Sequence, residues 1–180
     1  MDLKKTFSLA LAALAVTGVL GAPAGAAGGM KSLGSDPSGD GPPALDITSL
    51  HAGRAGNNLE IHIGIANMIP VIGGYPQLPG IQWAFEVKGR TFIAEAYVAN
   101  RNPAFLLFED MGSSFEQLAN LEGTYEGGVI KMLVPLKLID ARSGSKIAGA
   151  GENDVDAHVH AGPQTYVADT LTTTKTLTLP

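Results

Sequence analysis

The chain has 180 residues, of which 12 are basic and 17 acidic, so its formal net charge is -5. This balance argues against nucleic acid as a partner, because nucleic-acid-binding surfaces carry a basic footprint. The sequence contains no cysteine, which excludes disulfides, thiolate metal ligands and a cysteine nucleophile. A hydrophobic content of 45% is typical of a chain that folds around a core.

Residues 1–26 have the features of a secretory signal peptide. Lys4 and Lys5 form a positive head, residues 7–20 are almost entirely apolar, and Ala24-Gly25-Ala26 offers the small residues that signal peptidase accepts. The alternative is a membrane anchor, but the apolar run is shorter than the roughly 20 residues that cross a bilayer. We predict cleavage near residue 26, a secreted or extracellular protein, and no membrane attachment afterwards.

Two further regions follow the predicted signal peptide. Residues 27–43 are rich in Gly, Ser and Pro without apolar periodicity, which predicts a flexible leader. Residues 44–180 are predicted to form one domain in which apolar residues recur with a period of two, as in half-buried strands. The strands expected from this pattern cover residues 59–66, 81–88, 91–98, 104–109, 123–126, 129–134, 165–168 and 171–179.

The turns between these strands indicate the fold class. Lys88-Gly89-Arg90 has the length and composition of a tight hairpin turn. Residues 115–121 and 136–141 have apolar residues at three-residue spacing and predict short helical turns. Short strands separated by Gly, Pro and Asn turns favour an all-β fold, an antiparallel β-sandwich of jelly-roll-like type. The alternative is an up-and-down barrel, which prefers more uniform strands and loops.

An acidic loop is the first candidate site. In Asp36-Pro37-Ser38-Gly39-Asp40-Gly41, oxygen-bearing side chains occupy positions one, three and five, and glycine occupies position six, as in calcium-binding loops. The twelfth position is Ile47 instead of Glu, so the full helix-loop-helix pattern is absent. Asp46 offers a further carboxylate, and Asp36, Asp40 and Asp46 are therefore the candidate calcium ligands. The alternative is an acidic linker with local Asx turns.

A second candidate is the segment 154–160. If it is extended, its polar side chains share one face: Asp154, Asp156, His158 and His160. A His-x-His pair binds zinc or copper when a third ligand converges, and His51 or His62 is the candidate for that ligand. The alternative is a solvated sheet face with no metal.

Other catalytic motifs are absent from the sequence. There is no Gly-x-Ser-x-Gly elbow and no phosphate-binding glycine loop followed by a helix and lysine. We therefore expect no enzyme. Trp83 shares its parity with apolar neighbours and is expected in the core. Tyr75 and Tyr97 are the candidate ligand contacts, the alternative being aromatic rings that cover a sheet edge.

Several short segments resemble family-nine-like carbohydrate-binding and DOMON-like β-sandwiches, which are appended to secreted bacterial hydrolases and peptidases. The segments that carry this resemblance are Asp36-Pro37-Ser38-Gly39-Asp40, residues 45–50, residues 58–63, residues 83–89, residues 129–136 and Val167-Ala168-Asp169-Thr170. The resemblance implies a sandwich with calcium held by an acidic loop beside the first strand. The paired exposed tryptophans that clamp sugar in that group have no counterpart in this chain.

The sequence thus predicts a secreted, non-catalytic β-sandwich that acts as a binding or accessory module and is stabilised by calcium. Its expected ligand is an extracellular polysaccharide or another cell-surface ligand, and a separate secreted protein is a further candidate partner. Two alternatives remain. One is a small secreted metal-dependent enzyme that uses the face from Asp154 to His160, and the other is a cell-surface protein-interaction domain.

Overall fold

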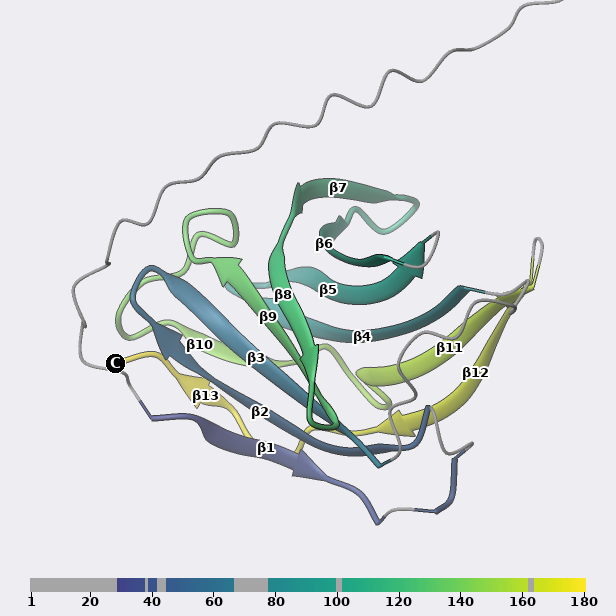
Figure 1. Cartoon of the computed structure of the whole chain (residues 1–180). Helices are drawn as coiled ribbons and strands as arrows, with labels where there is room; N and C mark the ends of the chain where they lie inside the picture. Colours follow the sequence, from purple (N-terminus) through teal and green to yellow (C-terminus); the bar gives the residue numbers. More distant parts are fainter. Residues whose placement is uncertain (1–28, 38, 42–44, 67–77, 100–101, 162–163) are drawn as a thin grey trace, which may run out of the picture.

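The structure is a computed structural model that describes residues 29–37, 39–41, 45–66, 78–99, 102–161 and 164–180. These residues form strands and turns, with no helix among them, and the strands make two antiparallel sheets that pack together as two layers (Figure 1). The predicted all-β sandwich is therefore confirmed. No helix in the described part of the chain is long and apolar enough to cross a membrane.

The first layer is a five-stranded sheet with the order β1-β2-β3-β9-β8. Its strands are β1 (Lys31–Ser35), β2 (Ile47–Ala55), β3 (Asn58–Ile65), β9 (Val129–Pro135) and β8 (Glu122–Glu126). Along β3 and β9 buried and half-buried residues mostly alternate, which is the period of a strand with one face on the core.

The second layer is an eight-stranded sheet whose main order is β12-β11-β4-β5-β6-β7. Its strands are β12 (Gln164–Leu171), β11 (Val155–Ala161), β4 (Leu78–Val87), β5 (Arg90–Ala99), β6 (Asn102–Asp110), β7 (Phe115–Asn120), β10 (Lys146–Gly149) and β13 (Leu177–Thr178). The first part of β4 pairs with β11 and its last part with β10, which in turn pairs with β13.

The core lies between the two layers and is built from the inward residues of both. Ile61 and Ile63 come from β3, while Trp83 and Phe85 come from β4, and all four are fully buried. The ring centroids of Trp83 and Phe85 lie 4.8 Å apart. The prediction that Trp83 belongs to the core is confirmed, and its parity places the alternate residues of β4 on the outer face.

The predicted turn between β4 and β5 is present. Lys88 and Gly89 have φ angles of 54° and 77°, and two successive positive values are characteristic of the two-residue turn that matches the twist of a hairpin. Gly89 takes this conformation without the steric cost that a Cβ atom imposes. The turn fixes the register in which Phe85 pairs with Phe92.

Other predicted elements differ from the structure. Residues 31–35, which the sequence placed in a flexible leader, form β1 and pair with β2. Residues 115–121 were predicted as a helical turn, but most of them form β7, whose pairing with β6 overrides the three-residue spacing. After Pro135 the chain makes a hydrogen-bonded turn, not a helix. The Thr-rich end contributes only the two-residue strand β13, and residues 1–26 lie outside the described part.

Candidate functional site

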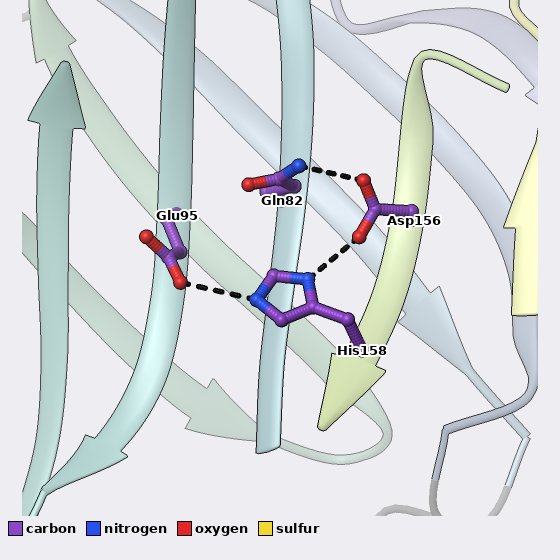
Figure 2. A network of polar contacts seen from close by, with 4 residues as sticks. All are labelled: Gln82, Glu95, Asp156 and His158. Atoms are coloured by element: carbon purple, nitrogen blue, oxygen red, sulfur yellow. Dashed lines mark hydrogen bonds and ion pairs between the residues drawn. The ribbon is translucent and has the colours of Figure 1, made fainter. Parts of the chain in front are cut away.

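A row of polar side chains crosses the outer face of the eight-stranded sheet. Gln82 of β4 pairs in register with Glu95 of β5 on one side and with Asp156 of β11 on the other. Their neighbours in sequence, such as Trp83 and Ala157, are buried in the core. Because side chains alternate along a strand, the polar residues point away from the core (Figure 2). The register of three strands therefore assembles this group.

His158 lies at the centre of the group. Its Nδ1 is 2.6 Å from Oδ1 of Asp156, and its Nε2 is 3.3 Å from Oε1 of Glu95 (Figure 2). Gln82 donates a hydrogen bond of 2.6 Å from Nε2 to the other oxygen of Asp156. Both ring nitrogens thus face carboxylates, an arrangement that favours the doubly protonated imidazolium.

The imidazole is 4% exposed although it lies on an outer face. Gly80 is the register partner of His158 across β4 and β11, and a Cβ atom at that position would come within 2.3 Å of Nε2. The glycine therefore lets the ring lie close against the sheet. Burial alone lowers the pKa of His158, but the hydrogen bonds and charges of Asp156 and Glu95 outweigh this effect and raise it to about 9.

A hollow of about 310 Å³ opens over this group. Its polar lining is Gln82, Glu95, Asp156 and His158, and its apolar lining is Ile93, Phe108, Phe115 and Val167. Two of the apolar side chains are strongly exposed, Phe115 at 63% and Val167 at 60%. The hollow therefore joins charged and amide groups to an accessible aromatic ring, the combination found in sites for polar organic ligands.

Asp154 is not part of this outer face, contrary to the sequence prediction. Its carboxylate is buried and accepts a hydrogen bond of 2.9 Å from Nε1 of Trp83 in the core. It also accepts hydrogen bonds from the backbone N–H and the hydroxyl of Thr173. Asp154 precedes β11 and turns inward, whereas Asp156 and His158 meet on the outer face. The fourth predicted ligand, His160, has a side chain that the structure does not describe.

The third metal ligand expected from His51 or His62 does not reach this face. The two histidines pair across β2 and β3 in the five-stranded sheet, in the other layer of the sandwich. Nε2 of His62 lies 2.9 Å from Glu60, and the same carboxylate pairs with Lys131 at 2.6 Å. These side chains form a polar group of their own on the opposite surface.

A separate acidic cluster lies where β1, β2 and β12 meet. Ligand atoms of Asp36, Asp40 and Asp169 lie within 4.8 Å of one another. The structure therefore brings together Asp36 and Asp40, as the sequence predicted, and adds Asp169 from β12. Asp46, the third predicted ligand, is buried beside the loop and accepts a hydrogen bond from the backbone N–H of Gly39 at 2.7 Å. Within the described residues this is the group suited to a metal ion.

The two predicted aromatic ligand contacts have different outcomes. Tyr75 lies outside the described residues. Tyr97 is half-buried and pairs in register with Gly80 and Ala104, so it shares the outer face but does not line the hollow.

The sequence did not single out Gln82 or Glu95, although the alternation of β4 and β5 already pointed both outward. Phe115 had no such signal, because its segment was predicted as a helical turn and its strand forms through pairing with β6.

No family model, curated protein or solved structure matches this chain. The functional argument therefore depends on the geometry of the site.

Proposed function

We propose that this chain is an exported, non-catalytic binding module that takes an extracellular polysaccharide in the hollow on the outer face of the eight-stranded sheet. The observation that carries the proposal is the exposed ring of Phe115 beside Gln82, Glu95 and Asp156 in one hollow. A flat apolar ring stacks on the hydrophobic face of a sugar, while carboxylates and amides bind its hydroxyl groups.

The state of His158 supports binding over catalysis. A general base at neutral pH needs a nitrogen that is free of its proton, and its best pKa lies near the working pH. Asp156 and Glu95 occupy both nitrogens of this ring and raise its pKa to about 9. The imidazolium then serves to fix the two carboxylates in place, which presents a preorganised polar surface to a ligand.

Pull-down of the purified full-length chain on insoluble cellulose, xylan and chitin tests the proposal. Phe115→Ala is expected to lower the affinity by about two- to tenfold and the bound fraction with it, since loss of a stacked ring removes about 0.5–1.5 kcal/mol. Met111→Ala is the matched control, because Met111 is 56% exposed and lies outside the hollow. Equal retention of the two variants, or no retention of the parent chain, would overturn the polysaccharide assignment and favour a protein-interaction domain.

Catalysis and export are tested separately. Release of reducing ends from the same polysaccharides would contradict a non-catalytic module. Export predicts that the protein recovered from the culture medium begins near residue 27, which mass spectrometry of the intact chain measures. A mature protein that still carries residues 1–26 would contradict cleavage of the predicted signal peptide.

A further inference from the structure

Three carboxylates from separate parts of the chain meet at one edge of the sandwich, and a fourth lies beside the loop that carries two of them. Asp36 follows β1, Asp40 lies in the next turn, Asp46 precedes β2 and Asp169 belongs to β12. Among the described residues, none of the ion pairs involves any of these four. Like charges at this spacing repel one another, so a cation bound between them would stabilise the cluster.

Asp46 supplies an independent sign of such a partner. The residue is 2% exposed. Its Oδ2 accepts a hydrogen bond from the backbone N–H of Gly39, which lies in the turn between Asp36 and Asp40, so the carboxylate faces the loop that carries both. Its Oδ1 is buried without a hydrogen-bond partner among the described residues. A buried carboxylate oxygen without a donor is costly, and a cation beside it removes that cost.

Asp169 connects the cluster to the other layer. Its Oδ2 accepts a hydrogen bond of 2.6 Å from the backbone N–H of Ile47, at the start of β2. The acidic loop lies directly against this side chain, because a Cβ atom at Gly41 would come within 3.0 Å of the Cβ and Cγ atoms of Asp169. The cluster therefore spans the five-stranded sheet and the edge strand of the eight-stranded sheet.

The charges act on one another as expected for an anionic pocket. Partial burial, together with the charges of Asp40, Asp169 and Asp46, raises the pKa of Asp36 above its ordinary value.

We propose that Asp36, Asp40 and Asp169 bind a calcium ion, with the free oxygen of Asp46 completing the set. All four donors are carboxylates. Calcium is bound by six to eight oxygen atoms, which come from carboxylates, backbone carbonyls and water. Zinc sites instead favour nitrogen and sulfur ligands. Magnesium is smaller, requires near-ideal octahedral geometry and usually keeps several of its water ligands. The ion ties the loop after β1 to β12, and this inference is independent of the proposed polysaccharide site.

Thermal unfolding of the full-length chain in millimolar calcium, magnesium or zinc, and in a chelator, tests the proposal. A ligand that binds only the folded state raises the unfolding midpoint, and we expect a calcium-specific rise of about 5 °C. Asp40→Asn is the main variant. Asp40 is exposed, so its substitution does not disturb the packing of the core. Asp140→Asn is the matched control at an exposed carboxylate outside the cluster.

The effect of Asp40→Asn on the unfolding midpoint is expected to differ between chelator and calcium. In chelator, Asp40→Asn removes repulsion and is expected to leave the midpoint unchanged or raise it, so a failure to fold is not confused with loss of the ion. In calcium it is expected to lose most of the rise, while Asp140→Asn keeps it. No rise in the parent chain, an equal rise with all three metals, or a rise that persists in both Asp40→Asn and Asp169→Asn would each overturn the proposal.

Discussion

The indole of Trp83 donates a hydrogen bond of 2.9 Å to the carboxylate of Asp154, so the largest ring of the core is joined to a buried acid. The backbone adds to this link, because the N–H of Ala84 donates to the carbonyl of Asp154 at 2.7 Å. Thr173 donates to the same carboxylate from its backbone and its hydroxyl. Asp154 therefore fixes the start of β11 between β4 and the segment that follows β12.

Replacement of Asp154 by alanine is expected to lower the free energy of unfolding by about 3 kcal/mol. The substitution leaves the indole N–H of Trp83 and the two donors of Thr173 without their acceptor, and each buried donor that loses its partner costs roughly 1–3 kcal/mol. Urea unfolding followed by tryptophan fluorescence measures the loss.

Asp140→Ala is the control for this substitution. Asp140 pairs with Lys88 on the surface, where both side chains are well exposed, so its removal is expected to change the free energy of unfolding by less than about 1 kcal/mol. Equal effects of Asp154→Ala and Asp140→Ala would contradict the structural role of Asp154.

Stability is expected to fall as the pH rises through the titration of His158. The folded-state pKa is about 9 because, against the effect of burial, Asp156 and Glu95 hold the proton, whereas the unfolded value is near 6.5. A raised pKa stabilises the folded state fully below about pH 6.5, and this stabilisation is lost between about pH 6.5 and 9. The difference corresponds to an upper bound of about 3 kcal/mol.

Chemical denaturation at a series of pH values from 6 to 10 measures this dependence. In His158→Gln the fall over this interval is expected to disappear, since glutamine keeps polar contacts but does not titrate. Gln82 faces the same group and does not titrate either, so among the described residues that line the hollow the charged partners of the ring are Glu95 and Asp156. A parent chain whose stability is constant from pH 6.5 to 9 would exclude a strongly held proton on His158.

The sequence predicted the central strands because alternation is a local signal. Residues 91–98 fall within β5, while 59–66 and 81–88 match β3 and β4 except for one residue at the end of each range, and the Lys88-Gly89 turn joins β4 to β5. β1 and β7 were missed for a physical reason. β1 is short, rich in small and polar residues, and forms because β2 offers backbone partners, while β7 depends in the same way on β6.

The candidate sites were predictable to different degrees. Asp36 and Asp40 are close in sequence, so their spacing predicted their proximity. Asp169 joins them through the packing of β12 beside β2, a contact between residues more than 120 positions apart that no local pattern encodes. Asp154 was misplaced because strict alternation was extended one residue beyond the start of β11, where the chain turns inward.

Replacement by alanine is expected to destabilise the fold strongly at one phenylalanine of this chain and only weakly at another. Phe85 is fully buried between the rings of Trp83 and Phe92, so Phe85→Ala is expected to cost about 3–5 kcal/mol of unfolding free energy through the cavity it leaves. Phe115 is 63% exposed, and Phe115→Ala is expected to cost less than about 1 kcal/mol. Urea unfolding of both variants measures the contrast. A large loss of stability in Phe115→Ala would indicate that its ring supports the fold and is not reserved for a ligand.

The close approach of His158 to Gly80 gives the last prediction. A Cβ atom at Gly80 would lie 2.3 Å from Nε2 of His158 and 3.0 Å from Oε1 of Glu95, both too near for unstrained contact. In Gly80→Ala the ring is therefore expected to move away from Glu95, which removes one of the two carboxylates that hold its proton. The pKa of His158 is expected to fall from about 9 toward 6.5, as an NMR titration of the histidine ring protons measures.

Gly29→Ala is the matched control for this variant, since nothing lies within 4 Å of a Cβ atom at Gly29. It is expected to leave both the histidine titration and the unfolding midpoint unchanged, whereas Gly80→Ala is expected to lower the free energy of unfolding by about 1–3 kcal/mol through overpacking. If His158 titrates near pH 9 in both variants, the ring does not depend on the space above Gly80. In that case contacts other than the one with Glu95 hold the proton, that of Asp156 among them, and the group on the outer face tolerates displacement of Glu95.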